Sequence, residues 1–340
     1  MSSLLAPRRA ADPRQNNGLR RYARVVAGCT LLLIFAGGLV TSTGSGLSVP
    51  DWPLSYGQLM PRMVGGILYE HGHRMIAGTV ALMMAVLCLW TWRVEPRRWV
   101  RNLAFAAMGA VLAQAVLGGL TVIFLLPPAI SSAHAGLAEI FLCLTVTLAT
   151  ALSHGWLNAP PRTTAGAAFP LPLPVLGICT TGIMFLQVMI GAWMRHIGAG
   201  LAIPDFPLAF GRLVPASFTG PIAIHFAHRI GALCVSVAVI GLGVQVLRRC
   251  RGDAWLTRPA ALLLTMLLVQ VTLGATAVWT KLSVLPTTAH VMIGGATVAV
   301  STLLTLRLWR RFQLPAAQAV GAGVRTAAST PATDARGVTA

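Results

Sequence analysis

The stretch YEHGHRMIAG, residues Tyr69–Gly78, begins an apolar run of membrane-spanning length. It places four ionisable side chains at the mouth of that run, namely Glu70, His71, His73 and Arg74. Ionisable groups in such a position are costly and usually serve function. Glu70 and His73 are three residues apart and therefore share one helical face. The rest of the chain is interpreted outward from this stretch.

The composition predicts an all-α membrane protein. Of 340 residues, 56% are hydrophobic and only 10% are charged, and several windows of about twenty residues carry almost no charge. The 26 basic residues exceed the 8 acidic ones, but they lie in short segments between apolar runs. This pattern orients a protein in a lipid bilayer and argues against nucleic-acid binding. The six cysteines have no paired spacing, so neither a zinc site nor a disulfide framework is indicated.

Eight transmembrane helices are expected. They cover residues 22–42, 69–92, 101–125, 130–153, 170–195, 222–247, 258–280 and 287–309. Arginine is concentrated before the first span, after the last, and in the connections that follow spans two and six. By the positive-inside rule both termini are cytoplasmic and the even-numbered spans begin at the outer face. The amino end lacks the apolar core of a signal peptide and leads directly into the first span, so it is interpreted as an ordinary cytoplasmic tail. We expect a bacterial inner membrane, with the mitochondrial inner membrane as the alternative because the tail is rich in arginine and poor in acidic residues.

The chain contains an internal repeat. GSGLSVPDWPLSYGQLMP begins at Gly44, and the similar GAGLAIPDFPLAFGRLVP begins at Gly198. Further matches follow in the same order and pair His73 with His228, Gln114 with Gln270, and His134 with His290. The repeat predicts two pseudo-symmetric four-helix bundles in parallel orientation, related by an axis near the membrane normal. Gln114 and Gln270 are expected to bond across helices.

The repeat also sets the expected domain boundaries. We expect a cytoplasmic tail over 1–21, a first bundle over 22–153, a cytoplasmic linker over 154–169, a second bundle over 170–309 and a disordered cytoplasmic tail over 310–340. The outer loops after spans one and five are rich in Pro, Gly, Asp and aromatic residues. Such loops are expected to fold as compact caps over the outer ends of the bundles.

Each half supplies two histidines, at the outer beginnings of its second and fourth spans. One histidine in a helix is usually a packing residue. Four histidines in a two-by-two pattern are harder to explain by packing alone. Imidazoles that face each other across a four-helix bundle can hold a haem iron or another metal. A zinc site needs a third or fourth ligand near each pair, and the second half has no acidic residue there. Haem is therefore favoured over a metal ion.

Other polar residues accompany the histidines. Arg74 and Arg229 follow histidines directly, where haem propionates would lie, and interfacial snorkelling is the alternative. His71, His225 and Arg195 are further candidates for positioning a substrate or meeting propionates.

Three more polar positions lie near the fourth and eighth spans. Ser131 and Thr287 follow prolines and are expected to cap these spans. Glu139 lies five residues after His134 and does not share its helical face. It is interpreted as a supporting group, part of a proton path, or a structural polar residue.

The two halves differ three residues before the first histidine of each, where Glu70 stands in one and His225 in the other. A bundle that only holds two equivalent haems needs no carboxylate on the ligand face. A carboxylate beside a bound haem can take a proton or stabilise positive charge on the porphyrin rim. The first half is therefore the candidate reaction site and the second half the candidate cofactor site.

Taken together, these features resemble the haem A synthase family of cytochrome oxidase assembly enzymes, over about residues 22–309. The resemblance is carried by TGSGLS…DWPLSYGQLMP, Glu70-x-x-His73-Arg74, His134, His228-Arg229 and His290. It implies an oxidoreductase that oxidises a peripheral methyl group of haem O to a formyl group by successive hydroxylations, with oxygen derived from water. One departure is that some bacterial members carry a cysteine pair in the first outer loop, and this sequence has none there.

The resemblance also implies roles for residues and partners. His228 and His290 would hold a haem b cofactor, and the substrate haem would lie in the first half. We expect His73 and His134 to bind the substrate-haem iron and Glu70 to be catalytic. A haem O synthase, the oxidase assembly machinery and the lipid bilayer are the expected partners, and a homo-oligomer is compatible with the sequence. Two other functions stay open, a di-haem b-type electron-transfer cytochrome and a haem carrier or transporter.

Overall fold

The computed structural model describes residues 16–160, 163–164 and 171–313. Over these residues the chain is almost entirely helical, and eight helices are long and apolar enough to cross a membrane. The all-α, multi-pass membrane fold is therefore confirmed. The greater part of the predicted amino-terminal tail, the middle of the predicted linker and the carboxyl-terminal tail from residue 314 lie outside the described residues.

The eight long helices fall into two sets of four. The first set is α1 (Asn17–Ser42), α2 (Gly66–Val94), α3 (Arg98–Ile123) and α4 (Pro128–Ala151). The second set is α6 (Leu173–His196), α7 (Gly220–Arg249), α8 (Ala254–Trp279) and α9 (Val284–Arg311). The eight predicted spans are confirmed with ends displaced by a few residues. Helix α1 begins inside the predicted tail because the Asn16 side chain accepts the N–H of Leu19 at 3.0 Å and caps it.

Four short elements complete the described part of the chain. Helix α5 (His154–Leu157) occupies the start of the predicted linker, where the Ser153 side chain caps it. Strand β1 (Thr163–Thr164) pairs in parallel with β2 (Phe312–Gln313). The 3₁₀ helix η2 (Ala199–Leu201) lies between α6 and α7. These pieces do not alter the all-helical architecture.

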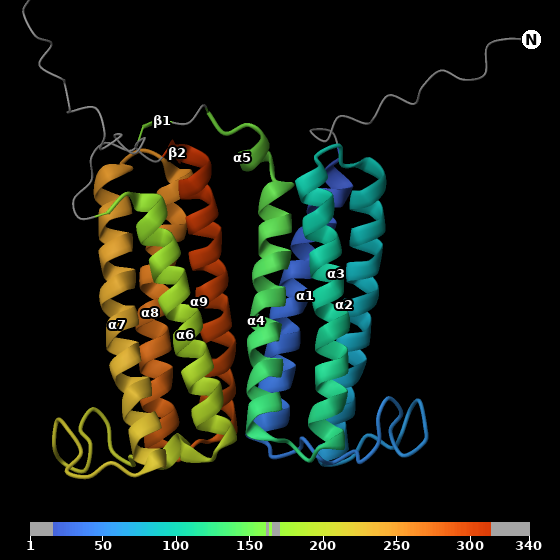
Figure 1. Ribbon diagram of the computed structural model, residues 1–340, viewed down its shortest axis with the longest axis vertical. Coiled ribbons are helices and arrows are strands. Elements are labelled where there is room, and N and C mark those ends of the chain that lie inside the picture. The colour runs from blue at the N-terminus through green and yellow to red at the C-terminus, as the bar shows by residue number, and fades with distance from the viewer. Residues whose placement is uncertain (1–15, 161–162, 165–170, 314–340) are drawn as a thin grey trace, which may run out of the picture.

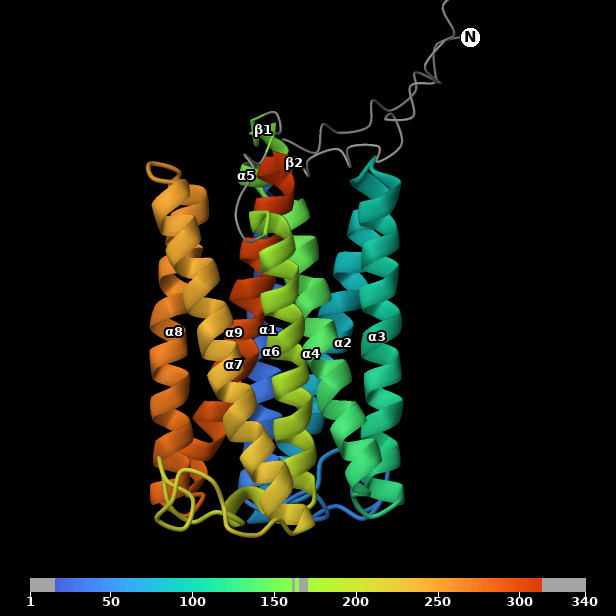
Figure 2. The same ribbon diagram turned by 60° about the vertical axis from the view of Figure 1, so that its left-hand side comes forward.

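Each set of four helices closes on itself to form a group. In the first group α1 and α3 each pack against α2 and α4, and in the second group α6 and α8 each pack against α7 and α9. The groups meet through α1 and α4 on one side and α6 and α9 on the other, so these four helices lie in the middle of the molecule in both views (Figures 1 and 2). The order of neighbours is the same in both groups. The symmetry axis that the repeat implies stays a prediction.

The buried apolar side chains of each group gather away from the long loops. We call residues 43–65 the first loop and 197–219 the second loop, and both lie at the same end of the molecule, the loop end (Figure 1). The core of the first group includes Val26, Met84 and Leu148, and that of the second includes Val246 and Leu304. All of these lie toward the opposite end. The loop end of each group is left for the polar residues of the candidate site.

The prediction that Ser131 and Thr287 cap the amino ends of α4 and α9 is wrong. Helix α4 begins at Pro128 and α9 at Val284, and neither has a side-chain cap. Proline is preorganised for the first helical position, so α4 starts before Ser131. The Ser131 hydroxyl is buried without a partner, and the Thr287 hydroxyl donates to the Ser283 carbonyl of its own helix at 2.7 Å.

Candidate functional site

The four histidines lie within about two turns of the loop end, on α2, α4, α7 and α9. Each imidazole rests against a glycine of the preceding long helix. If each glycine carried a Cβ atom, that atom would lie close to Cε1 of the histidine ring. The distance would be 3.2 Å for Gly37 and His73 and 3.1 Å for Gly118 and His134. It would be 2.8 Å for Gly191 and His228 and 3.0 Å for Gly274 and His290. Glycine thus lets the backbone approach each ring closely and fixes its position.

The ring separation of the second pair is compatible with two ligands to one metal. The ring centroids of His228 and His290 are 6.5 Å apart, with an interplanar angle of 73°. Metal–imidazole bonds of about 2 Å on two sides would place ring centres roughly 6 to 7 Å apart. His290 Nδ1 lies 3.2 Å from the Gln270 carbonyl oxygen and can donate to it. Nε2 of the same ring lies 3.5 Å from the Gln270 amide nitrogen, a long contact that a metal bound at Nε2 would replace.

Glutamine side chains brace three of the four histidine backbones. Gln114, Gln187 and Gln270 donate to the carbonyls of His134, His228 and His290 at 2.9, 2.7 and 3.1 Å. The predicted cross-helix bonding of Gln114 and Gln270 is therefore confirmed, whereas Gln187 was missed. The Gln187 amide also lies 3.0 Å from His228 Nδ1, and its Oε1 has no partner. In this orientation the amide N–H groups face both the His228 carbonyl and Nδ1, so Nδ1 is the acceptor.

The first pair has unsatisfied nitrogens. The Nδ1 atoms of His73 and His134 are buried and have no hydrogen-bond partner. Buried polar atoms without a partner are uncommon and mark places where a ligand or water completes the site. In donor type, a pair of imidazoles in each group fits the haem iron that the sequence predicts, and the ligand roles stay predictions.

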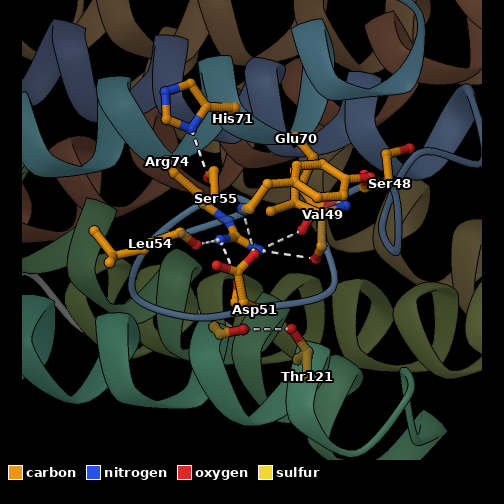
Figure 3. Close-up of polar contacts among 11 residues, drawn as sticks. Ser48, Val49, Asp51, Leu54, Ser55, Glu70, His71, Arg74 and Thr121 are labelled. Atoms are coloured by element: carbon orange, nitrogen blue, oxygen red, sulfur yellow. Dashed lines mark hydrogen bonds and ion pairs between the residues drawn. The ribbon is translucent and has the colours of Figure 1, made fainter. Parts of the chain in front are cut away.

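Glu70 joins α2 to the first loop. Its side chain is buried, and the N–H of Val49 donates to Oε2 at 2.8 Å (Figure 3). Arg74 donates to Oε1 at 2.6 Å across one helical turn. Both carboxylate oxygens are thus engaged in holding the loop and its neighbouring arginine.

Arg74 binds the loop backbone rather than a side chain of the loop. Its Nη1 donates to the carbonyls of Asp51 and Leu54 at 2.7 and 2.9 Å, and its Nη2 to that of Val49 at 3.3 Å (Figure 3). Beside it, His71 Nδ1 shares a hydrogen bond of 2.7 Å with the Ser55 hydroxyl. The sequence predicts a role in binding propionates for Arg74, and that role stays a prediction.

The second loop is attached in the same way. Arg229 donates to the carbonyls of Leu208, Asp205 and Ile203 at 2.7, 2.6 and 3.1 Å. The N–H of Ile203 donates to His225 Nδ1 at 3.2 Å, as that of Val49 does to Glu70. His225 and Glu70 therefore share the task of accepting a loop N–H. Only Glu70 also forms an ion pair.

A braced turn lies inside each loop. The N–H groups of Tyr56 and Gly57 donate to the Asp51 carboxylate at 2.6 and 2.8 Å. These bonds, that of Gly57 foremost, hold the pKa of the Asp51 carboxyl below its usual value. The second loop repeats the turn with Asp205, Phe210 and Gly211, and the pKa of Asp205 is lowered for the same reason. The prediction that these loops fold compactly is confirmed.

The loops reach across the ends of their groups. In the first, the Trp52 ring packs on Gly119 of α3, and Leu126 lies over Gly46. In the second, Leu282 lies over Gly200. Each loop therefore reaches the connection between the third and fourth long helices of its group.

Arg195 lies where the two groups meet. It donates to the Ser42 hydroxyl of α1 at 2.9 Å, and the same oxygen accepts from Thr288 of α9 at 2.8 Å. Its predicted contact with propionates stays a prediction. The four glycines against the histidines were missed in the sequence, although the repeat aligns Gly37 with Gly191 and offered a signal.

The fold and the site together define a polytopic helical membrane protein with two histidine pairs near one face. A family model described as cytochrome oxidase assembly protein matches residues 20–65 and 66–304. The chain belongs to this family.

Several relatives carry the name Heme A synthase. That of Symbiobacterium thermophilum is 31% identical over 262 residues, which are 76% of this chain and 84% of the relative. That of Alkalihalophilus pseudofirmus is 27% identical over 297 residues, 86% of this chain and 98% of the relative. That of Geobacillus thermodenitrificans is 28% identical over 317 residues, 92% and 98% of the two chains.

Proposed function

We propose that this protein is a haem A synthase, a membrane oxidoreductase that oxidises a peripheral methyl group of haem O to a formyl group. Membership of the cytochrome oxidase assembly family and relatives named Heme A synthase support this proposal. The observation that carries it is the set of two histidine pairs, with each ring resting on a glycine, and with Glu70 three residues before the first histidine of only one pair.

His73 and His134 hold the substrate haem, and His228 and His290 hold a haem b. The unpartnered Nδ1 atoms of the first pair and the 6.5 Å ring separation of the second support these assignments. Haem b, when bound, supplies one-electron redox chemistry. The folded loops close the outer ends of both pockets and limit access of water.

Glu70 is the catalytic carboxylate in this proposal. It lies three residues from His73 on the same face of α2, and it holds the loop that covers the first pair. It accepts a proton from, or stabilises positive charge at, the methyl group under oxidation. Arg74 and Arg229 hold the loops, and because each directly follows a ligand histidine in the sequence they are also the proposed partners of the propionates.

The protein works in a bacterial plasma membrane with both termini in the cytoplasm. The arginines cluster at the end opposite the loops, which supports this orientation. Haem O comes from a haem O synthase, and the product passes to the oxidase assembly machinery.

One observation favours a second candidate, a di-haem b-type cytochrome or a haem carrier. Glu70 and His225 accept equivalent loop N–H groups, so the two halves are attached to their loops alike. Two equivalent haem sites would use such halves without any reaction.

Haem extraction separates these candidates. Membranes that contain the protein together with a haem O synthase are extracted, and the haems are analysed by mass. The formyl product is expected. Haem O alone, with haem bound to both halves, would support the second candidate instead.

Glu70→Gln tests the catalytic role while keeping an acceptor for the loop. The amide oxygen still accepts the N–H of Val49, but the negative charge and the ion pair with Arg74 are lost, so haem A should fall roughly 100-fold or more. His225→Gln is the matched control, because it also keeps an acceptor for its loop and should leave haem A formation largely intact. Normal haem A in the Glu70→Gln membranes would refute the assignment.

A further inference from the structure

Glu139 is a buried carboxyl group for which the proposed reaction has no use. It lies on α4, is 3% exposed, and its Oε1 has no hydrogen-bond partner. The ion pairs formed within residues 16–160, 163–164 and 171–313 do not include it. A carboxyl in such surroundings is much more stable as the neutral acid than as an unpaired anion.

The carboxyl of Glu139 lies between the two helix groups. Its Oε2 is 3.0 Å from the point where a Cβ on Gly295 of α9 would stand, and Ile34 of α1 lies 3.6 Å from that same point. The repeat that aligns His134 with His290 also aligns Glu139 with Gly295. Side chains on both positions would collide, so a single carboxyl fills the space between them.

This position is related to both histidine pairs. Glu139 follows His134 by five residues on α4, and Gly295 follows His290 by five residues on α9. At 1.5 Å per residue, the carboxyl lies about 7.5 Å along the helix axis from one histidine of each pair. It is therefore placed to respond to charge in either pocket.

Other polar groups follow Glu139 toward the end opposite the loops. Cys143 lies one turn further along α4 and is the titratable group that faces it, with its Sγ 3.5 Å from the Thr302 hydroxyl of α9. Further along the same helices, Thr181 of α6 contacts the hydroxyls of Ser301 and Thr305 at 2.8 and 3.1 Å. The contacts from α1 and α9 at the carboxyl itself, Ile34 and Gly295, carry no charge.

We propose that Glu139 is a proton-binding site shared by the two haem pockets. It holds its proton at rest and releases it when a bound haem loses an electron, because the added positive charge stabilises the carboxylate. When a one-electron acceptor takes an electron from a bound haem, the O–H bond of Glu139 breaks and the proton passes to bulk water. Reduction of the haem, as by dithionite, draws a proton back from water and re-forms the O–H bond. This inference rests on the proposed function, because a haem bound between the histidines of a pair supplies the change of charge.

Infrared difference spectroscopy of the haem-loaded protein tests this inference. The spectra are recorded between the oxidised and the dithionite-reduced states, in the region of the carboxylic acid C=O stretch. A band from the protonated acid is expected to appear on reduction and to be absent from Glu139→Gln. A spectrum that Glu139→Gln leaves unchanged would overturn the proposal, and so would a Glu139 band that does not respond to reduction.

An exchange of the carboxyl between helices guards against a folding artefact. The double variant Glu139→Gly with Gly295→Glu places one carboxyl in the same space from α9. It should regain the redox-linked band that Glu139→Gly alone loses, while the haem absorbance of all variants shows whether both pockets are filled. Failure of the filled double variant to regain the band would count against a shared site.

The two proposals can fail separately. A redox-linked Glu139 band in a protein that makes no haem A would leave this inference standing and refute the synthase proposal. Haem A formation without such a band would do the reverse.

Discussion

Each of the four histidine rings packs against a glycine of the neighbouring helix. A methyl group added on that glycine would lie only 2.8 to 3.2 Å from Cε1 of the ring. Contacts that short require the ring to move. The rings are therefore positioned by the absence of a side chain on the neighbouring helix. The glutamines add a second restraint by holding the histidine backbones. A ligand that must keep its angle to an iron depends on both restraints.

Gly191→Ala should displace His228 and weaken haem binding in the second group. The new Cβ would be 2.8 Å from Cε1, so the ring must shift, and haem affinity should fall roughly 10- to 100-fold. Gly182→Ala in the same helix is the control, because a Cβ there has nothing within 4 Å. The measurement is bound haem per protein by absorbance. Equal haem content in the two variants would contradict this account of the glycine.

Among single residues, the sequence indicated the four histidines but not the glycines that lie against their rings. Histidine and glutamate stand out in an apolar helix because burying them is costly. Gly37 and Gly118 do not stand out, because small residues are common in transmembrane helices for packing alone. The second task of Glu70 also could not be foreseen, since it depends on where the backbone N–H of Val49 comes to lie.

Among the elements, the two loops are folded and attached to their helices by side chains, so they are more than simple connections. Each is held by an arginine that binds three backbone carbonyls, by one acceptor on the same helix, and by an aspartate inside its turn. An arginine fork suits this task because it presents several donors in fixed directions. The loops therefore act as fixed covers of the histidine pairs.

Arg74→Lys should loosen the first loop. A lysine cannot reach three carbonyls with the same geometry, and the lost bonds should cost about 1 to 2 kcal/mol. Backbone hydrogen exchange at Val49 and Asp51 should then be roughly 5 to 30 times faster. The exposed Arg62→Lys, in the same loop, is the control. Unchanged exchange in Arg74→Lys would show that the loop is held by something else.

Acid should loosen the turns of both loops. The pKa of Asp51 is lower in the folded loop than in an unfolded chain, so its contribution is present above about pH 4 and is lost as the pH falls through the folded value. Exchange at Tyr56 and Gly57, corrected for intrinsic rates, should rise over that range. Asp51→Asn should abolish this response in the first loop while the Asp205 turn still responds. A response that survives Asp51→Asn would assign it to another group.

The folded character of the loops was predictable from their Pro, Gly and Asp content and from their duplication. Their attachment was not. Arg74 and Arg229 stand at the membrane interface, where an arginine can equally bind propionates, lipid headgroups or backbone carbonyls, and only the folded chain distinguishes among these partners.

For the whole molecule, the repeat predicted two groups of four helices, and the order of neighbours agrees with it. The sequence could not predict that α1, α4, α6 and α9 would join the groups. In a membrane, a helix face against lipid and a face against another helix are both apolar, so hydrophobicity does not separate them. Glu139, whose Oε1 has no partner, was one of the few residues in the sequence that indicated a helix face buried between the two groups.

Ser42→Ala should weaken the contact between the groups at the loop end. The Ser42 oxygen accepts from Arg195 and from the fully buried Thr288, so its removal leaves donors of α6 and α9 unsatisfied. Loss of such a shared acceptor should cost about 1 to 2 kcal/mol and lower the thermal unfolding midpoint in detergent by a few degrees.

Ser236→Ala is the matched control, because that hydroxyl bonds only to the Ala232 carbonyl of its own helix. Ser42→Thr keeps the shared oxygen and should restore most of the stability. If Ser42→Ala unfolds at the same temperature as Ser236→Ala, the groups are held together by helix packing alone.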